Sequence, residues 1–502
     1  MEENLNPIPE ETPKVPFVAR GAEFLFGGVI LLLAIFMCNF VLYGGFHLAF
    51  GLVGAAAIGC SWLYLHKTGV RLGRYEKTLL ILSLVICLGF GRSNDGFVKF
   101  VMLLFLFVAV NLALCIGAGQ NRRSPDTATS LLDAPRSFFR LGMGNLGKTA
   151  GGLAEGFRTG GEPVRRIGAV GTGLLISVPV LMLMVTLLMN ADAAFEGLMD
   201  LLPEIELEEY IHSALWGFFL GWILYSRGLS LARADRPVPA SRKNKGMNPM
   251  TVNTVLIMVC LVYVVYLLSQ LAYFAGGLSG ILPEGYTLSE YARRGFFEMA
   301  WLCVINLSIL CFALWQIRQE KLPRLTKIAG TFLGAITVFL VITASAKMLL
   351  YIGSYGLTRL RVLTQVIMLW LALTTILVTL RLYKPNFGYM KAVVLTAMIL
   401  GTLVFWVDVN TVVASYNVKA YQSGKLETMD VEYLGYLGYS ATPWLIELAD
   451  DNDPEIAQRA AEVLENHARF GRYRFDGIDD FRNWNFLEVR SQALLKEYDE
   501  TR

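Results

Sequence analysis

The feature that most constrains this chain is a succession of hydrophobic blocks separated by polar segments. A hydrocarbon core about 30 Å thick is crossed by roughly 20 apolar residues in a helix, which rises about 1.5 Å per residue. Eleven blocks of about this size occur, at residues 22–43, 46–66, 77–92, 96–118, 167–190, 210–230, 250–275, 295–317, 326–352, 361–381 and 390–413. We therefore predict an all-α fold, a polytopic transmembrane helical bundle of about eleven spans.

The composition agrees with a membrane protein. Of the 502 residues, 55% are hydrophobic and only 17% are charged, whereas an average soluble domain has roughly 25% charged residues. Lipid must therefore solvate much of the chain. The third hydrophobic block is short and the fourth follows closely, so these two can form a re-entrant pair without changing the orientation of the later spans.

Lys and Arg are distributed unequally between alternate loops, which predicts the orientation. These residues stay on the cytoplasmic side of membrane helices. With the N-terminus inside, the cytoplasmic loops and their margins hold 27 of them and the opposite loops only six, while residues 191–209 carry seven acids and no base. An odd number of spans then places the C-terminus outside the cytoplasm.

These patterns divide the chain into five parts. Residues 1–21 are rich in Glu and Pro and are predicted to be a disordered cytoplasmic N-terminus without a cleavable signal peptide. Residues 22–118 hold spans one to four, 119–166 form a basic cytoplasmic interfacial loop, and 167–413 hold spans five to eleven. Residues 414–502 form the tail.

The tail differs from the rest of the chain because it is acidic and amphipathic. It holds 10 Lys and Arg against 17 Asp and Glu, which gives a net charge of −7. Asp453–Pro454–Glu455 is typical of a helix start, and one face of the following helix carries Ile456, Ala460, Val463 and Leu464. We predict a small helical extracytoplasmic domain, either a cap docked on the membrane part, which we favour, or an independent binding module.

One segment matches a nucleotide-binding motif literally. Residues Gly142–Thr149 satisfy G-x4-G-K-[ST], the loop that surrounds phosphates in many nucleotide hydrolases. That loop should follow a buried strand of an α/β domain, and a 48-residue loop between two spans cannot supply one. We interpret the segment as a basic, glycine-rich stretch on the inner-leaflet surface, with Arg136 and Arg140 near lipid phosphates. The apolar residues expected on the membrane are Leu131, Leu132, Phe138, Phe139 and Leu141.

No metal or other cofactor is predicted. All seven cysteines lie inside predicted spans, and the four histidines are widely scattered, so neither type shows metal-ligand spacing. A nucleic-acid partner is likewise not expected.

The topology gathers a set of polar residues near the outer leaflet. Ionisable groups within spans are costly and often functional, so these residues are candidates for one external cavity between spans eight, nine and eleven. The candidate residues are Gln270, Tyr273, Arg293, Arg294, Glu298, Lys347, Tyr351, Arg359, Arg361 and Asp408. The alternative is structural, since such cations can reach lipid headgroups and the acids can neutralise them.

Three segments resemble a known family. Met189–Phe195, Glu290–Glu298 and Tyr355–Arg361, whose letters include YARRGFFE and YGLTRLR, are similar to bacterial multi-pass membrane proteins catalogued only as a domain of unknown function. The likeness runs from about residue 170 to 450 and includes Ala414–Asn417 and Thr442–Trp444. It implies a bacterial cytoplasmic membrane and no established activity.

Three classes of function stay open, and no catalytic residue is assigned. We favour a binder or carrier, independent of ATP, of an anionic or lipid-linked envelope component at the outer leaflet; its expected partners are membrane lipids and that component. A membrane-embedded transferase with a polyprenyl-phosphate-linked donor is the second. Such enzymes usually carry a catalytic acid in the first external loop, which here is only Gly44–Gly45, so the acid would come from 191–209. The third is a structural or signalling scaffold.

Overall fold

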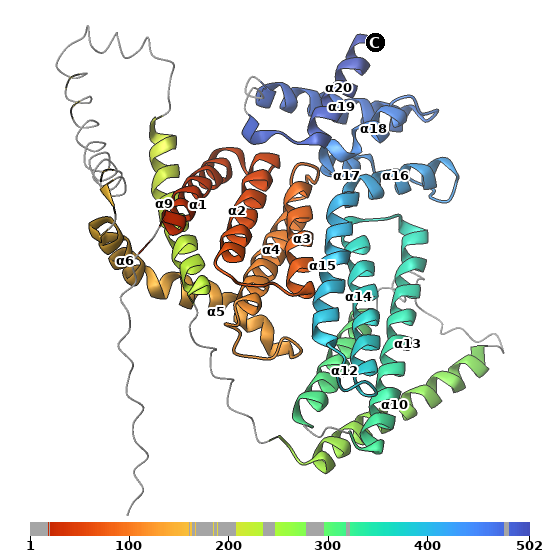
Figure 1. The fold of residues 1–502 in the computed structure, drawn as a ribbon. Coiled ribbons are helices and arrows are strands. Elements are labelled where there is room, and N and C mark those ends of the chain that lie inside the picture. The colour runs from red at the N-terminus through yellow and green to blue at the C-terminus, as the bar shows by residue number, and fades with distance from the viewer. Residues whose placement is uncertain are drawn as a thin grey trace, which may run out of the picture. The chain divides into compact units, whose positions relative to one another are not determined.

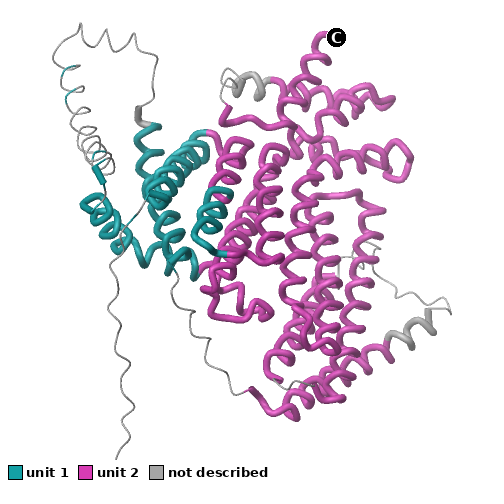
Figure 2. Tube along the Cα trace, in the orientation of Figure 1, with its two compact units in different colours: residues 1–43, 59–70, 136–235 teal, residues 44–58, 71–135, 236–502 magenta. Residues whose placement is uncertain are grey.

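The computed structural model describes residues 19, 21–159, 161–162, 166, 184, 188, 207–233, 246–277, 296–317, 322–475 and 481–501. Every regular element in these ranges is a helix, which confirms the predicted all-α class. The chain divides into two compact units (Figure 2). Unit 1 comprises residues 1–43, 59–70 and 136–235, and unit 2 comprises residues 44–58, 71–135 and 236–502.

Within the described ranges, eight helices are long and apolar enough to cross a membrane. They are Gly21–Gly44, Leu48–Lys67, Gly96–Gly117, Pro249–Ser269, Phe296–Gln316, Arg324–Tyr355, Arg359–Arg381 and Tyr389–Val407. The chain is therefore an integral, multi-pass membrane protein, as the hydrophobic blocks predict.

The other three predicted spans have different outcomes. Residues 77–92 fall largely on α3 (Arg74–Gly89), whose 16 residues reach only about 24 Å at the usual helical rise. Residues 210–230 fall within α9 (Leu207–Ala232), which is long enough but is not among the helices apolar enough to cross a membrane. Residues 167–190 lie outside the described residues except for Met184 and Leu188. A total of eleven spans thus stays a prediction.

Unit 1 is built on a close pair of helices, α1 (Gly21–Asn39) and α9 (Figure 1). Gly217 and Gly221 form a small-xxx-small pair on α9, the pattern that lets membrane helices approach closely. A Cβ atom on Gly217 would lie 2.3 Å from the Cα of Ile35, and one on Gly221 would lie 3.0 Å from the Cα of Leu31. Glycine is therefore required at this crossing.

Unit 2 holds most of the apolar helices. They are α3, α4 (Gly96–Gly117), α10 (Pro249–Gly277), α12 (Phe296–Gln316), α13 (Arg324–Tyr355), α14 (Arg359–Arg381) and α15 (Tyr389–Val407). Helix α13 packs against α10, α12 and α14, and α15 lies between α14 and α3 (Figure 1). The Trp406 indole nitrogen of α15 donates to the Val85 carbonyl of α3 at 3.1 Å. A Cβ atom on Gly89 would lie 2.6 Å from the Phe405 ring, so glycine keeps α3 close to α15.

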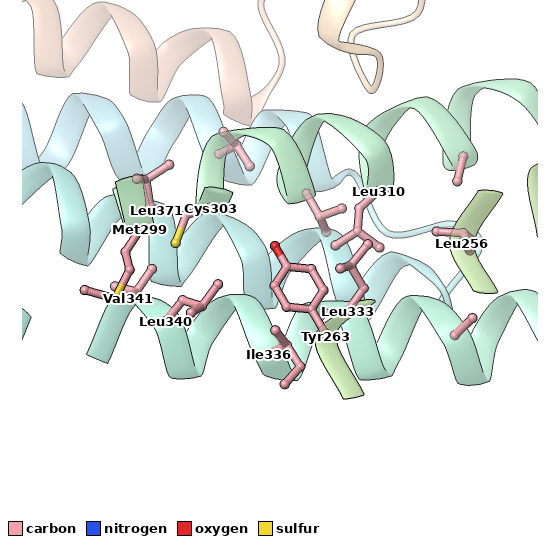
Figure 3. Close-up of a cluster of buried hydrophobic side chains, with 14 of the residues drawn as sticks. Leu256, Tyr263, Met299, Cys303, Leu310, Leu333, Ile336, Leu340, Val341 and Leu371 are labelled. Carbon is pink, nitrogen blue, oxygen red and sulfur yellow. The ribbon is translucent and has the colours of Figure 1, made fainter. Parts of the chain in front are cut away.

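Buried apolar side chains of α10, α12 and α13 form a core around Tyr263 (Figure 3). A buried hydrogen-bond chain crosses this core. The Tyr263 hydroxyl donates to Oδ1 of Asn306 at 2.9 Å, and Nδ2 of Asn306 donates to the Thr337 hydroxyl at 3.1 Å. Both atoms of the Asn306 amide are thus paired within the apolar core. Asn306 joins three helices, which is the structural role that polar residues often have within a membrane.

Every regular element in the described part of the tail is a helix. Its elements are α16 (Val409–Gln422), α17 (Val431–Tyr436), η5 (Gly438–Ala441), α18 (Thr442–Leu448), α19 (Pro454–Phe475), η6 (Phe481–Asn483) and α20 (Phe486–Thr501). Helix α19 begins at Pro454, as its start motif predicts, and the Asp453 carboxylate accepts a hydrogen bond from the Glu455 amide at 2.9 Å. Ala460 and Leu464 on its predicted apolar face are buried.

The tail shares its hydrophobic core with the membrane helices of unit 2. Leu357, Val362 and Val404, at the ends of α14 and α15, pack against the buried cluster of the tail. At a second attachment, the Phe486 amide donates to the Gly91 carbonyl at 2.8 Å, and Nδ2 of Asn485 donates to the Ser93 carbonyl at 3.1 Å. These contacts support a docked cap over an independently folded module.

The glycine crossing in unit 1 leads to a first prediction. Gly217→Ala should lower the free energy of unfolding by about 1–3 kcal/mol, because its methyl group would overlap the backbone of Ile35. Gly28→Ala on α1 is the matched control, since a Cβ atom there has no neighbour within 4 Å. Thermal unfolding of the detergent-solubilised variants measures both effects. Equal melting temperatures for the two variants would contradict the proposed crossing.

A second prediction concerns His467, which joins α19 to α17. Its Nε2 lies 3.2 Å from the Gly435 carbonyl, and burial lowers the pKa of this imidazole below its ordinary value of 6.5, although the Gly435 hydrogen bond opposes the shift. The unfolded chain then binds the proton more readily than the folded one. The stability contributed by neutral His467 is therefore present above about pH 6.5 and is lost as the pH falls toward the folded-state pKa.

His467→Gln keeps a hydrogen-bond donor and removes this titration. We expect the wild-type melting temperature to fall more between pH 7.5 and pH 5.5 than that of His467→Gln. A parallel loss in both proteins would show that other groups cause the pH dependence.

Candidate functional site

The segment Tyr355–Arg361 forms the connection between α13 and α14. Gly356 has φ 74°, in the left-handed region that favours glycine, and ends α13. The Arg361 guanidinium donates to the carbonyl oxygens of Tyr355, at 3.1 Å, and Gly356. It also lies over the Tyr351 ring, 4.3 Å from the ring centroid. Arg361 therefore satisfies carbonyl groups that the end of α13 leaves unpaired.

Asn417 of α16 holds the same connection from the other side. Its Oδ1 accepts a hydrogen bond from the Leu357 amide at 2.6 Å, and its Nδ2 donates to the Leu357 carbonyl at 2.8 Å. The Tyr433 hydroxyl of α17 accepts a hydrogen bond from the Arg359 amide at 3.0 Å. The side chain of Asn417 thus replaces a backbone partner, and α16 and α17 are both fixed to the α13–α14 connection.

Arg359 forms an ion pair with Asp95. Its Nη1 lies 3.1 Å from Oδ2 of Asp95, whose side chain is only 2% exposed. Asp95 also begins α4 by accepting a hydrogen bond from the Val98 amide at 3.0 Å. Arg359 and Arg361 were predicted to line a cavity, and the structure gives both of them structural partners.

Asp408 does not lie within a continuous span. The sequence predicted a span over 390–413, but α15 ends at Val407 and α16 begins at Val409, with Asp408 at φ 56° between them. The reason is local, because Oδ2 of Asp408 accepts hydrogen bonds from the amide and hydroxyl of Thr411, at 3.0 and 2.7 Å. Asp408 is therefore the N-cap of α16 and has a structural role at the helix break.

The remaining predicted site residues are not brought together as one set. Lys347 is half-buried on α13, eight residues before its end, and Glu298 is exposed in the first turn of α12. Arg293 and Arg294 lie outside the described residues, and Gln270 and Tyr273 lie on α10 with side chains outside the described part. Among the described candidates, Arg361 contacts Tyr351, and Arg359 lies beside them in sequence at the α13–α14 connection. The ten-residue cavity stays untested as a whole.

A groove with different walls occurs on α16. It has a volume of about 540 Å³, within the roughly 300–1,000 Å³ of small-molecule sites. We call it the α16 groove, and it is lined by Thr411, Val412, Ser415, Tyr416, Lys419, Ala420, Ser423, Lys425 and Trp444. The lining includes two lysines and no acidic residue.

The α16 groove follows the solvent-facing side of one helix. Val413, Ala414 and Val418 are buried in the tail core, whereas Val412, Tyr416, Lys419 and Ser423 recur at helical spacing on the opposite side. Trp444 of α18 supplies a second wall, and Nζ of Lys419 lies 5.4 Å from its ring centroid. The arrangement offers positive charge beside aromatic and apolar surface.

The position of the α16 groove relative to a hydrocarbon core follows from the length of α15. Its 19 residues extend about 28 Å, close to the roughly 30 Å of a hydrocarbon core. Helix α16 turns away from the direction of α15 immediately beyond its end (Figure 1). The α16 groove therefore begins where an apolar core of this thickness would end.

Sequence reasoning missed this groove because it assigned Thr411 and Val412 to the last predicted span and the other lining residues to an acidic tail. A usable signal was present. Lys419 and Lys425 are the first two charged residues of the tail and precede its first acid, Glu427. What the sequence could not show is that Trp444 packs beside them.

Comparison with known proteins identifies the family. Residues 78–448 match the model of a domain of unknown function, DUF4153. The chain belongs to the DUF4153 family. This confirms the resemblance drawn from the sequence segments. No curated protein and no solved structure matches the chain. The DUF4153 region contains the α13–α14 connection and every residue of the α16 groove, and it ends at the last residue of α18.

The nucleotide-motif segment of this DUF4153 protein folds as a series of helices. It runs through η3 (Ser137–Gly142), η4 (Met143–Asn145) and α6 (Leu146–Thr159), and no strand precedes it in the described part of the chain. The Thr149 hydroxyl donates to the Ser226 hydroxyl at 3.1 Å, and Ser226 donates to the Gly142 carbonyl at 2.8 Å. The segment thus packs on α9 and does not form a phosphate-binding loop.

Phe139 and Met143 in this segment are exposed, as is Arg140. The position of this segment on the inner-leaflet surface stays a prediction. Among the residues that the structure describes, no group of three or more His, Cys, Asp or Glu is placed to hold a metal ion.

The Asn417 contacts lead to a third prediction. Asn417→Ala would leave the amide and carbonyl of Leu357 without their partners, and each loss costs about 1–3 kcal/mol when the group is buried. We expect a melting temperature several degrees below wild type in detergent. Asn452→Ala is the matched control, because Asn452 is exposed in the tail. If both variants melt like wild type, Asn417 does not hold the connection.

Proposed function

We propose that this DUF4153 protein is a binder or carrier, independent of ATP, of an anionic or lipid-linked envelope component. The site would be the α16 groove at the outer leaflet of a bacterial cytoplasmic membrane, with the N-terminus in the cytoplasm and the C-terminus outside. This orientation rests on the distribution of Lys and Arg between the loops.

The α16 groove is the observation that carries the proposal. Lys419 and Lys425 are both exposed, and neither forms an ion pair with a described residue. A lysine near an anionic membrane surface contributes about 1 kcal/mol of attraction. Ser415 adds a hydroxyl group that can donate a hydrogen bond to an anion. The groove therefore has the chemistry of an anion site.

The same lining supports binding better than group transfer. A transferase of the kind considered above requires a carboxylate that acts as a general base or stabilises the reacting sugar. The walls of the α16 groove contain no Asp or Glu, and the acidic loop 191–209 lies outside the described residues. Binding needs only the cations and the apolar wall.

A fourth prediction tests this function. Phosphatidylglycerol is titrated into the detergent-solubilised protein, and the bound fraction is measured by native mass spectrometry. Lys419→Ala combined with Lys425→Ala should weaken binding about 30-fold, because two contributions of about 1 kcal/mol are removed. The lysines are exposed, so the melting temperature should stay unchanged.

Lys496→Ala is the matched control for lost charge. Lys496 is an exposed lysine of α20, outside the groove, that faces Glu500 at 3.9 Å. Equal affinity in the double variant, the control and wild type would refute an anion site in the α16 groove.

A further inference from the structure

The two ends of the α16 groove differ in chemistry. Thr411 and Val412 lie at the end that follows α15, and both lysines lie at the far end. Val412 and Lys419 are seven residues apart on one helix, a separation of about 10 Å. A ligand that fills the groove must therefore combine an anionic group with an apolar part about 10 Å away.

A compact anion would leave half of this surface unused. Val412 and Tyr416 are 36% and 39% exposed, and they continue the groove away from the charges. Leu403 and Val407, on the last turns of α15 before the break, are exposed as well. Exposed apolar side chains thus occur both before and after the helix break at Asp408.

The residue types also match the headgroup region of a bilayer. Tyr and Trp concentrate at that depth because each has an apolar ring with a polar edge, and a lysine can lay its apolar stem along such a ring while its charge stays hydrated. Tyr416, Trp444 and Lys419 provide this combination directly beyond the end of α15. A lipid headgroup would enter the groove from the side, without leaving the membrane surface.

Charge distribution argues against a large acidic partner such as a protein. The tail has a net charge of −7, and its first two bases are those in the groove. An acidic protein surface would meet the surrounding carboxylates of the tail, whereas a single headgroup would meet only the two lysines.

We infer that the α16 groove binds a membrane lipid with a phosphate headgroup. The phosphate lies between Lys419 and Lys425, and the start of the lipid chain lies along Tyr416 and Val412 toward the hydrocarbon core. This inference rests on the proposed function and names its ligand class, which includes phospholipids and polyprenyl phosphates. It excludes water-soluble phosphates as the principal ligand.

The test compares two ligands with related headgroups, phosphatidylglycerol and glycerol 3-phosphate, on the full-length protein in detergent. Native mass spectrometry gives the affinity for each. The apolar half is changed by combining Val412→Ser with Tyr416→Ser, and the charged half by the double lysine variant. Tyr436→Ser is the control for a lost exposed tyrosine, because Tyr436 is 86% exposed on α17 and lies outside the groove.

We expect wild type to bind phosphatidylglycerol at least 100-fold more tightly than glycerol 3-phosphate. The Val412 and Tyr416 double variant should lose about tenfold in affinity for the lipid, which corresponds to about half of one buried apolar side chain. It should keep the wild-type affinity for glycerol 3-phosphate, and the lysine variant should weaken both. Phosphatidylcholine, which has the same chains and no net charge, should bind weakly to all variants.

Two other outcomes would overturn the inference in different ways. If glycerol 3-phosphate binds as tightly as the lipid, and the apolar variant behaves like wild type, the ligand is a soluble anion. The inference then fails, whereas the proposed function still holds for an anionic component. If the lysine variant binds both ligands as wild type does, the proposed function fails together with the inference. Unchanged melting temperatures of all variants exclude misfolding as the cause of a loss.

Discussion

The paired hydrogen bonds between the Asn417 amide and the backbone of Leu357 hold this end of unit 2 together. The chain must leave α13 and enter α14 within a few residues, and the open backbone groups of that turn need partners. Asn417 supplies two of them from α16. Since α16 is thereby fixed at the ends of α14 and α15, its opposite face is exposed as the wall of a groove. The candidate site therefore results from the way in which α16 supplies hydrogen-bond partners to the backbone of this turn.

The same requirement explains why three of the predicted site residues have structural partners. In a membrane every polar group needs an internal partner, because lipid offers none. Arg359 pairs with Asp95, Arg361 ends α13, and Asp408 begins α16. Within the core, Asn306 joins three helices through both atoms of its amide. In these cases the polar residues near the apolar helices fix helix ends or join helices to one another.

The α16 groove differs because its two lysines neither cap a helix nor form an ion pair with a described residue. Lys419 and Lys425 lie on the exposed face of an amphipathic helix, and Trp444 provides an apolar wall beside them. Within a tail that is otherwise acidic, two lysines without ion-pair partners among the described residues form a local positive site. Position at the end of α15 then favours a ligand that is itself amphipathic. Fold and electrostatics thus both support the proposed lipid ligand.

The sequence alone determined the helical class, the positions of most spans and the start of α19, because these follow from local periodicity, block length and capping residues. It also carried the family resemblance. Only the tertiary structure decided that residues 390–413 break at Asp408, that the nucleotide motif packs as helix on α9, and that Lys419 meets Trp444. The break depends on the left-handed backbone of Asp408, and the other two depend on contacts between segments distant in sequence, and neither follows from block length and periodicity.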